Sequence, residues 1–125
     1  MAQKTIIITK YDKKRLASFL RDDLQKELNR ALVVEPKDIP KDVITMNSRF
    51  RLKDLKTGEE MIYTLVFPEE ENIYDNKISI FAPMGLALLG YKIGDIVEWP
   101  VPDGVLRVEV LEILYQPEAM GDYNL

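Results

Sequence analysis

Apolar positions in the first 40 residues recur at spacings of three and four, which is the repeat of one face of an α-helix. They predict one helix over residues 11–20 and a second over residues 23–33, which must end before Pro36. A β-branched run over residues 5–8 predicts a short strand or arm ahead of them. We therefore expect a short antiparallel helical hairpin, coiled-coil-like, whose apolar seams face each other.

Beyond Pro40 the pattern changes to that of strands joined by short turns. Residues 105–115 alternate polar and apolar positions and predict the longest strand. One short helix interrupts the strands, because Pro83 suits a first helical turn and Gly90 can end the helix in a left-handed conformation. The remaining predicted strands cover residues 43–46, 49–54, 61–67, 77–81 and 96–99.

This order of elements predicts an α+β fold with a mostly antiparallel sheet and one short helix beside it. The proline-containing stretch 34–42 is the one credible boundary in the chain. It divides the chain into an N-terminal arm with the helical hairpin, residues 1–40, and a sheet domain, residues 41–125. Leu88 and Leu89 lie on the inner face of the short helix. From periodicity alone, this helix is predicted to bury that apolar face at one end of the sheet.

Composition excludes several classes of function. The 125 residues are 46% hydrophobic and 30% charged, an ordinary globular balance, with no cysteine and no histidine. Ser–His and Cys–His catalysis are therefore excluded, as is a zinc-thiolate site, and we expect no catalytic residues, no cofactor and no metal.

The charge balance points to a protein partner. A net charge of −4 disfavours general binding to nucleic acid, which depends on Lys and Arg, and suits a basic protein surface. We expect no direct sequence-specific DNA binding. The chain has neither an apolar run of ~20 residues that would span a membrane nor an N-terminal targeting signal, so we expect a cytoplasmic protein.

The stretch from Ala82 to Asp95 resembles the C-terminal domain of the bacterial Gre transcription elongation factors. Residues 43–49 and 115–123 look like one branch of that family, the regulators of nucleoside diphosphate kinase. The three segments stand in order, and the resemblance covers nearly the whole chain, least so residues 10–40. The motif itself reads Pro83-Met84-Gly85, then Ala87-Leu88-Leu89-Gly90, then Gly94-Asp95.

The resemblance implies an FKBP-like fold for the sheet domain and RNA polymerase as the partner. In the Gre family, the loop before the short helix docks at the rim of the polymerase secondary channel, on the β′ side. The docking residues implied here are Ala82, Pro83, Met84 and Gly85. Phe81 either joins this apolar lip or belongs to the core.

Arg21, Asp22 and Asp23 form the expected hairpin tip. Gre cleavage factors carry acidic residues at the tip of a long coiled coil, where they help to hold a catalytic magnesium. A helix of roughly ten residues reaches only ~15 Å, so this tip is too short to enter a deep channel. We expect Asp22 or Asp23 to cap the second helix instead.

Two further groups have open interpretations. The acidic run of Glu69, Glu70 and Glu71 is either a solvated loop or faces a basic surface of the partner. Tyr91 and Trp99 could line an FKBP-type pocket, although the resemblance favours a filled core there.

The sequence therefore predicts a non-enzymatic regulator that binds RNA polymerase at the secondary-channel entrance and competes with Gre cleavage factors. One alternative is a factor that stimulates transcript cleavage, and another is an FKBP-like prolyl isomerase. A third is a generic adaptor with an indirect link to nucleoside diphosphate kinase.

Overall fold

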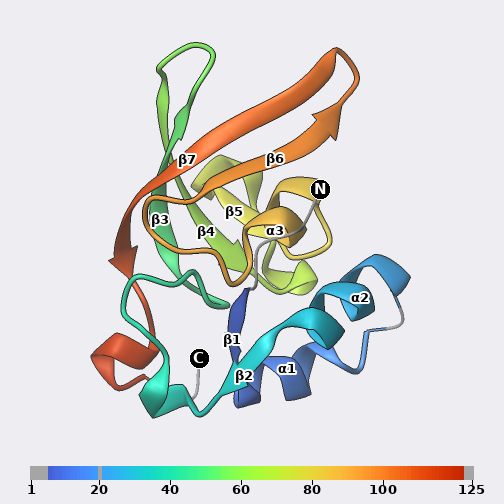
Figure 1. Cartoon of the computed structure of the whole chain (residues 1–125), viewed down its shortest axis with the longest axis vertical. Helices are drawn as coiled ribbons and strands as arrows, with labels where there is room; N and C mark the ends of the chain where they lie inside the picture. The colour runs from blue at the N-terminus through green and yellow to red at the C-terminus, as the bar shows by residue number, and fades with distance from the viewer. Residues whose placement is uncertain (1–5, 20, 123–125) are drawn as a thin grey trace.

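A computed structural model describes residues 6–19 and 21–122 (Figure 1). Three predictions touch residues outside this range. They concern Thr5 in the first strand, Leu20 at the end of the first helix, and residues 123–125 of the C-terminal tail. The chain forms a small two-stranded unit with two helices, and a five-stranded sheet that curls around a third helix.

The N-terminal unit begins with β1 (Ile7–Thr9) and α1 (Lys10–Leu16), followed by α2 (Asp22–Arg30) and β2 (Leu32–Val34). The strands β1 and β2 pair in parallel, so both ends of the helical pair are held together (Figure 1). Thr9 begins α1 as its N-cap, because its hydroxyl accepts a hydrogen bond from the backbone N–H of Asp12 at 3.0 Å.

The predicted second helix extends too far. The periodicity places residues 31–33 in this helix, but α2 ends at Arg30 and the chain continues as β2. The strand forms because Ile6 and Ile8 lie buried beside it, and Leu32 donates its backbone N–H to the Ile6 carbonyl at 2.9 Å. This partner is distant in sequence, so local helical spacing could not reveal it.

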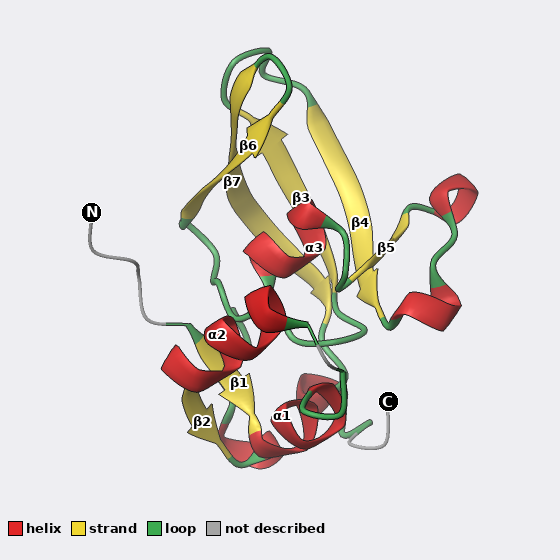
Figure 2. Ribbon diagram, turned by 90° about the vertical axis from the view of Figure 1, so that its right-hand side faces the viewer, coloured by secondary structure: helices red, strands yellow, loops and turns green. Residues whose placement is uncertain are grey.

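The five-stranded sheet has the order β5-β4-β3-β7-β6. Its pairings are antiparallel except for that between β4 and β5, so the predicted mostly antiparallel sheet is confirmed. Strand β3 lies at the centre of the sheet and β7 lies between β3 and the edge strand β6, and the first half of β7 forms a long hairpin with β6 (Figure 2). The strands are β3 (Arg49–Asp54), β4 (Glu60–Val66), β5 (Lys77–Ser79), β6 (Ile96–Val101) and β7 (Gly104–Tyr115).

The predicted strand over residues 43–46 is wrong as a regular strand. Val43 forms only a single bridge, to Lys92, and the segment hydrogen-bonds to the turn after α3 (Pro83–Leu88). The Ile44 N–H donates to the Tyr91 carbonyl at 2.8 Å. The segment resembles a strand in sequence because it is buried, with Ile44 and Met46 both inaccessible to solvent.

The short helix α3 packs against β5 and β6, inside the curl of the sheet (Figure 2). Leu88 is 0% exposed and Leu89 1% exposed, which confirms that they are core residues. Gly90 ends the helix with a φ of +84°, as the sequence predicted. The core joins both parts of the chain, because residues from α1, α2 and β1 cluster with residues from the large sheet.

The C-terminal tail makes hydrogen bonds to the segment that precedes β3. The Gln116 Nε2 donates to the carbonyls of Pro40 and Val43, each at 2.8 Å. Glu118, 7% exposed, accepts a hydrogen bond from the Thr45 hydroxyl at 2.7 Å. The tail therefore fixes the segment that connects the two parts of the chain, a role that its local sequence did not indicate.

Candidate functional site

The expected docking loop lies at the start of α3, with its members at different depths. Ala82 is the N-cap residue in an extended conformation, and Pro83 is the first helical residue and exposed. Met84 is half-buried against the core, whereas Gly85 is buried. A Cβ at Gly85 would lie 2.1 Å from the Ser79 carbonyl oxygen, so glycine is required there for packing.

The expected hairpin tip begins α2. Arg21 is its N-cap residue with extended backbone, and Asp22 and Asp23 occupy the first turn. The expectation that Asp22 or Asp23 serves as the N-cap is wrong, since the helix starts one residue earlier than predicted. Both carboxylates still lie where the helix dipole favours negative charge, and Asp23 accepts a hydrogen bond from the Leu24 N–H at 2.8 Å.

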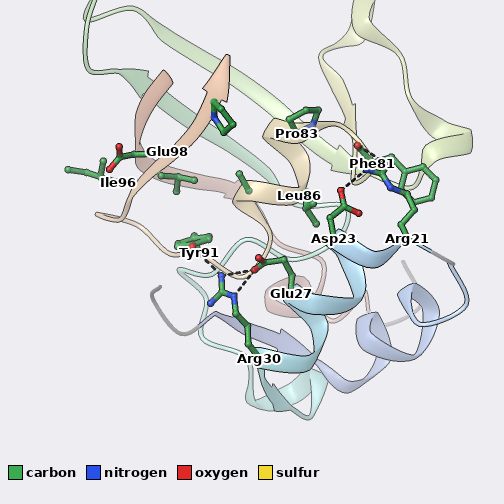
Figure 3. A pocket seen from close by; sticks show the side chains of 13 residues that line it. Arg21, Asp23, Glu27, Arg30, Phe81, Pro83, Leu86, Tyr91, Ile96 and Glu98 are labelled. Carbon is green, nitrogen blue, oxygen red and sulfur yellow. Dashed lines mark hydrogen bonds and ion pairs between the residues drawn. The ribbon is translucent and has the colours of Figure 1, made fainter. Parts of the chain in front are cut away.

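The structure brings the tip and the loop together. The Arg21 Nη1 donates to the carbonyl of Phe81 at 3.0 Å, and its guanidinium lies over the Phe81 ring at 4.6 Å (Figure 3). Phe19 packs edge-on against the same ring, with 5.1 Å between centroids. Phe81 thus lies between core and surface, in contact with the N-terminal unit.

An open groove of about 490 Å³ runs along this junction, between α2, α3 and the edge strand β6 (Figure 3). Its floor is apolar and its margin carries charged side chains in pairs. The residues that line it are Arg21, Asp23, Glu27, Arg30, Phe81, Pro83, Leu86, Ala87, Tyr91, Ile96, Val97, Glu98 and Pro100.

Ion pairs order the α2 side of the groove. Arg30 and Glu27 approach to 2.6 Å, and Arg30 also donates to the Tyr91 hydroxyl at 3.4 Å. Partial burial lowers the pKa of Arg30, but the hydrogen bonds to Glu27 and Tyr91 have the larger combined effect. The pKa of Arg30 is therefore raised above its ordinary value. On the opposite end, the hydrogen bond from Arg21 lowers the pKa of Asp23. Both shifts favour the charged forms of Arg30 and Asp23.

This arrangement suits the binding of a protein segment, because apolar contact surface with a charged margin is the usual composition of protein interfaces. No three acidic side chains cluster as a metal site within residues 6–19 and 21–122. In the same described part of the chain, none of the helices is both long and apolar enough to cross a membrane.

The contribution of α2 and β6 to the groove is not visible in the sequence. Glu27 and Arg30 stand three residues apart, a spacing that signals a helical ion pair but gives no direction in space. Of the two aromatic residues considered for a pocket, Tyr91 lines the groove, whereas Trp99 is 8% exposed and belongs to the core.

The acidic run forms part of a protruding connection between β4 and β5 (Figure 2). Glu69, Glu70 and Glu71 are exposed there. The following turn presents Ile73 at 72% exposure and Tyr74 at 94%. The two interpretations of the acidic run, solvated loop or partner contact, are both compatible with this exposure.

Comparison with known proteins identifies similar chains over most of this length. A family model described as "Transcription elongation factor, GreA/GreB, C-term" matches residues 39–115. The regulator of nucleoside diphosphate kinase from Escherichia coli K12 is 42% identical over 136 aligned positions, which cover 100% of both chains. The transcription elongation factor GreA from Clostridium botulinum (strain Eklund 17B) is 43% identical over 90 residues. That match covers 72% of this chain and 56% of the relative.

Solved structures agree with the fold. A prokaryotic transcription elongation factor GreA/GreB from Nitrosomonas europaea superposes with a TM-score of 0.75 and 45% identity, covering 90% of this chain and 100% of the other. The GreA factor homolog Gfh1 from Thermus aquaticus superposes with a TM-score of 0.55 and 25% identity, covering 89% and 99%.

Proposed function

The chain belongs to the GreA/GreB family of transcription elongation factors, and we propose that it is a non-enzymatic regulator that binds RNA polymerase. It docks at the secondary-channel entrance, on the β′ side, and excludes Gre cleavage factors from that position. In this proposal the sheet domain is FKBP-like, and α1 and α2 are a shortened counterpart of the helical hairpin of the family.

The observation that carries the proposal is the exposed position of Pro83 beside the groove. Pro83, Leu86 and Phe81 present apolar surface on one side of it, where the family motif lies. An apolar surface that a monomer leaves open, with charged residues at its margin, marks a site for a protein partner. Met84 lies beneath this surface and supports it from the core side.

The position of the tip supports a role that does not include cleavage. A catalytic tip must reach away from the body of the protein, whereas Arg21 is bonded to the Phe81 carbonyl of the sheet domain. Asp23 is occupied by an ion pair with Arg21 at 2.8 Å. The nine residues of α2 span only about 14 Å at the helical rise of ~1.5 Å per residue. Regulation therefore works by occupancy of the entrance.

The proposal places the protein in the cytoplasm with RNA polymerase. The name of the E. coli relative refers to nucleoside diphosphate kinase. For this chain we propose that any such link is indirect, through transcription, because the apolar surface is assigned to the polymerase.

A pull-down with core RNA polymerase, in the presence and absence of a GreA-type factor, tests the proposal. The parent protein should bind, and excess Gre factor should displace it. Met84→Asp should lose most of the binding, because a carboxylate under the loop disturbs its apolar contacts.

The control is Met120→Asp, which places the same charge at a methionine that is 67% exposed on the C-terminal turn. Both variants are checked by circular dichroism before binding is measured. Undiminished binding by a folded Met84→Asp variant would contradict the docking loop, and failure of the parent protein to bind would contradict the function itself.

A further inference from the structure

Arg21 makes three contacts at once, and two of them are with Phe81, the residue that precedes the expected docking loop. Its Nη1 donates to the Phe81 carbonyl at 3.0 Å, and its guanidinium covers the face of the Phe81 ring at 4.6 Å. Its Nη2 pairs with Asp23 at 2.8 Å, which holds the guanidinium in this orientation (Figure 3). A planar group with several donors is required for this combination.

Two backbone N–H groups of the loop are hydrogen-bonded to the strand that precedes it. The Phe81 N–H donates to the Ser79 hydroxyl at 2.9 Å, and the Ala82 N–H donates to the Ser79 carbonyl at 3.0 Å. Both bonds come from the preceding strand of the same domain. The Phe81 carbonyl points the other way and receives its hydrogen bond from Arg21, in the N-terminal unit.

The ring of Phe81 is likewise held from the N-terminal unit. Phe19 packs against it in a T-shaped arrangement with 5.1 Å between centroids, and Arg21 covers its face. Phe19 is itself held in place, because the Gln25 Nε2 donates to the Phe19 carbonyl at 2.7 Å. Two residues after Phe81 comes Pro83, whose fixed φ transmits the position of this carbonyl to the start of α3.

From this geometry we propose that Arg21 is a positioning residue, which holds the Phe81–Pro83 loop in its binding conformation and thereby couples the N-terminal unit to polymerase binding. The inference rests on the proposed function and adds a role for the tip. The tip acts on the polymerase indirectly, by ordering the surface that the sheet domain presents. A loop that is ordered before binding loses less conformational entropy when the partner arrives.

The test compares Arg21→Ala, Arg21→Lys and a matched control, Arg51→Ala. The side chain of Arg51 is 36% exposed and that of Arg21 37%, and both pair with carboxylates. The partners of Arg51, Glu60 and Glu112, lie on β4 and β7 of the sheet, so this substitution removes an equivalent surface pair away from the loop.

Two quantities are measured on each folded variant: affinity for core RNA polymerase, and hydrogen exchange of residues 79–90 in the free protein. We expect Arg21→Ala to bind roughly tenfold more weakly, because ordering of the loop then opposes binding. Its exchange should rise in this segment alone. Arg21→Lys should give an affinity and an exchange rate between those of the parent and of Arg21→Ala. Lysine keeps a hydrogen-bond donor but has no planar group to stack on the ring. Arg51→Ala should match the parent in both measurements.

The outcomes separate this inference from the function on which it rests. Binding by the parent and loss of binding in Met84→Asp would support the docking loop. If Arg21→Ala then shows the same affinity and the same hydrogen exchange as Arg51→Ala, the positioning role of Arg21 is overturned although the docking loop stands. If Arg21→Ala does not fold, Arg21→Lys decides, since parental binding and exchange in that variant also overturn the role. A parent that does not bind polymerase overturns both.

Discussion

Asp12 accepts a hydrogen bond from the backbone N–H of Met46, with 3.0 Å between its Oδ2 and the nitrogen. The contact joins α1 to the buried segment that leads into β3, across 34 positions of sequence. Arg15 meets the other carboxylate oxygen at 2.5 Å. Burial nevertheless raises the pKa of Asp12 from 3.8 to about 6, with a smaller contribution from the nearby charge of Glu118.

The first prediction concerns the pH dependence of stability. Because the folded-state pKa of Asp12 lies above the unfolded one, its contribution to the free energy of unfolding is complete below pH 3.8. It is lost as the pH rises through about 6. The interval corresponds to roughly 3 kcal/mol. Asp12→Asn removes the titration, so urea titrations at several pH values should show a flatter dependence between pH 4 and pH 6.

Asp38→Asn, on an exposed turn, removes the same charge from the surface and controls for the change in net charge. A dependence in Asp12→Asn as steep as in the parent would mean that Asp12 does not titrate in this interval.

The second prediction concerns Gly90, where the two parts of the chain meet. Its φ is +84°, and a Cβ there would lie 2.6 Å from the Cβ of Ile6. Gly90→Ala combines a left-handed backbone with an overlap in the core and should cost roughly 2–5 kcal/mol of unfolding free energy. Gly58 has a similar φ of +78°, but its Cβ would meet no described atom within 4 Å. Gly58→Ala should therefore cost only ~1–2 kcal/mol. Equal losses in chemical denaturation would refute the close approach to Ile6.

The third prediction concerns the tail. Gln116→Ala leaves the carbonyls of Pro40 and Val43 without their side-chain donor in a buried layer, which should cost about 1–3 kcal/mol. Met120→Ala, two residues beyond Glu118 and 67% exposed, should melt within error of the parent. Thermal unfolding measures both. A parental melting temperature for Gln116→Ala would show that the tail does not fix this segment.

The fourth prediction concerns the acidic tip. Asp22→Asn combined with Asp23→Asn should cost little stability, because both side chains are exposed and a surface ion pair contributes ~0–1 kcal/mol. Competition with a Gre factor for the polymerase should persist, because an amide oxygen at position 23 can still accept the Nη2 hydrogen bond that orients Arg21, and Arg21 then keeps its bond to the Phe81 carbonyl. The measurement is transcript cleavage by a backtracked polymerase complex with magnesium. The parent alone should not raise cleavage, and it should lower cleavage driven by a Gre factor. Cleavage that the parent stimulates and the double variant does not would favour the cleavage-factor alternative.

Local sequence determined the elements that depend on near neighbours. The alternation over 105–115 corresponds to β7, and the signals at Pro83 and Gly90 set the limits of α3. These features follow from the periodicity of side chains and from the backbone restrictions of proline and glycine, which act within a few residues. The family motif was likewise visible in the sequence, and the comparisons confirm it.

Tertiary structure decided the features that depend on partners distant in the chain. Leu32 and Val33 lie in a strand rather than in the predicted helix because β1 offers them a parallel partner. Asp12 lies in the first turn of α1, but the hydrogen bond that it accepts from the Met46 N–H links this helix to a segment 34 positions further along the chain. Arg21 and Phe81 are 60 positions apart, and only folding places the guanidinium on the loop. Spacing along a chain specifies which face a residue occupies, whereas packing of separate elements specifies what that face meets.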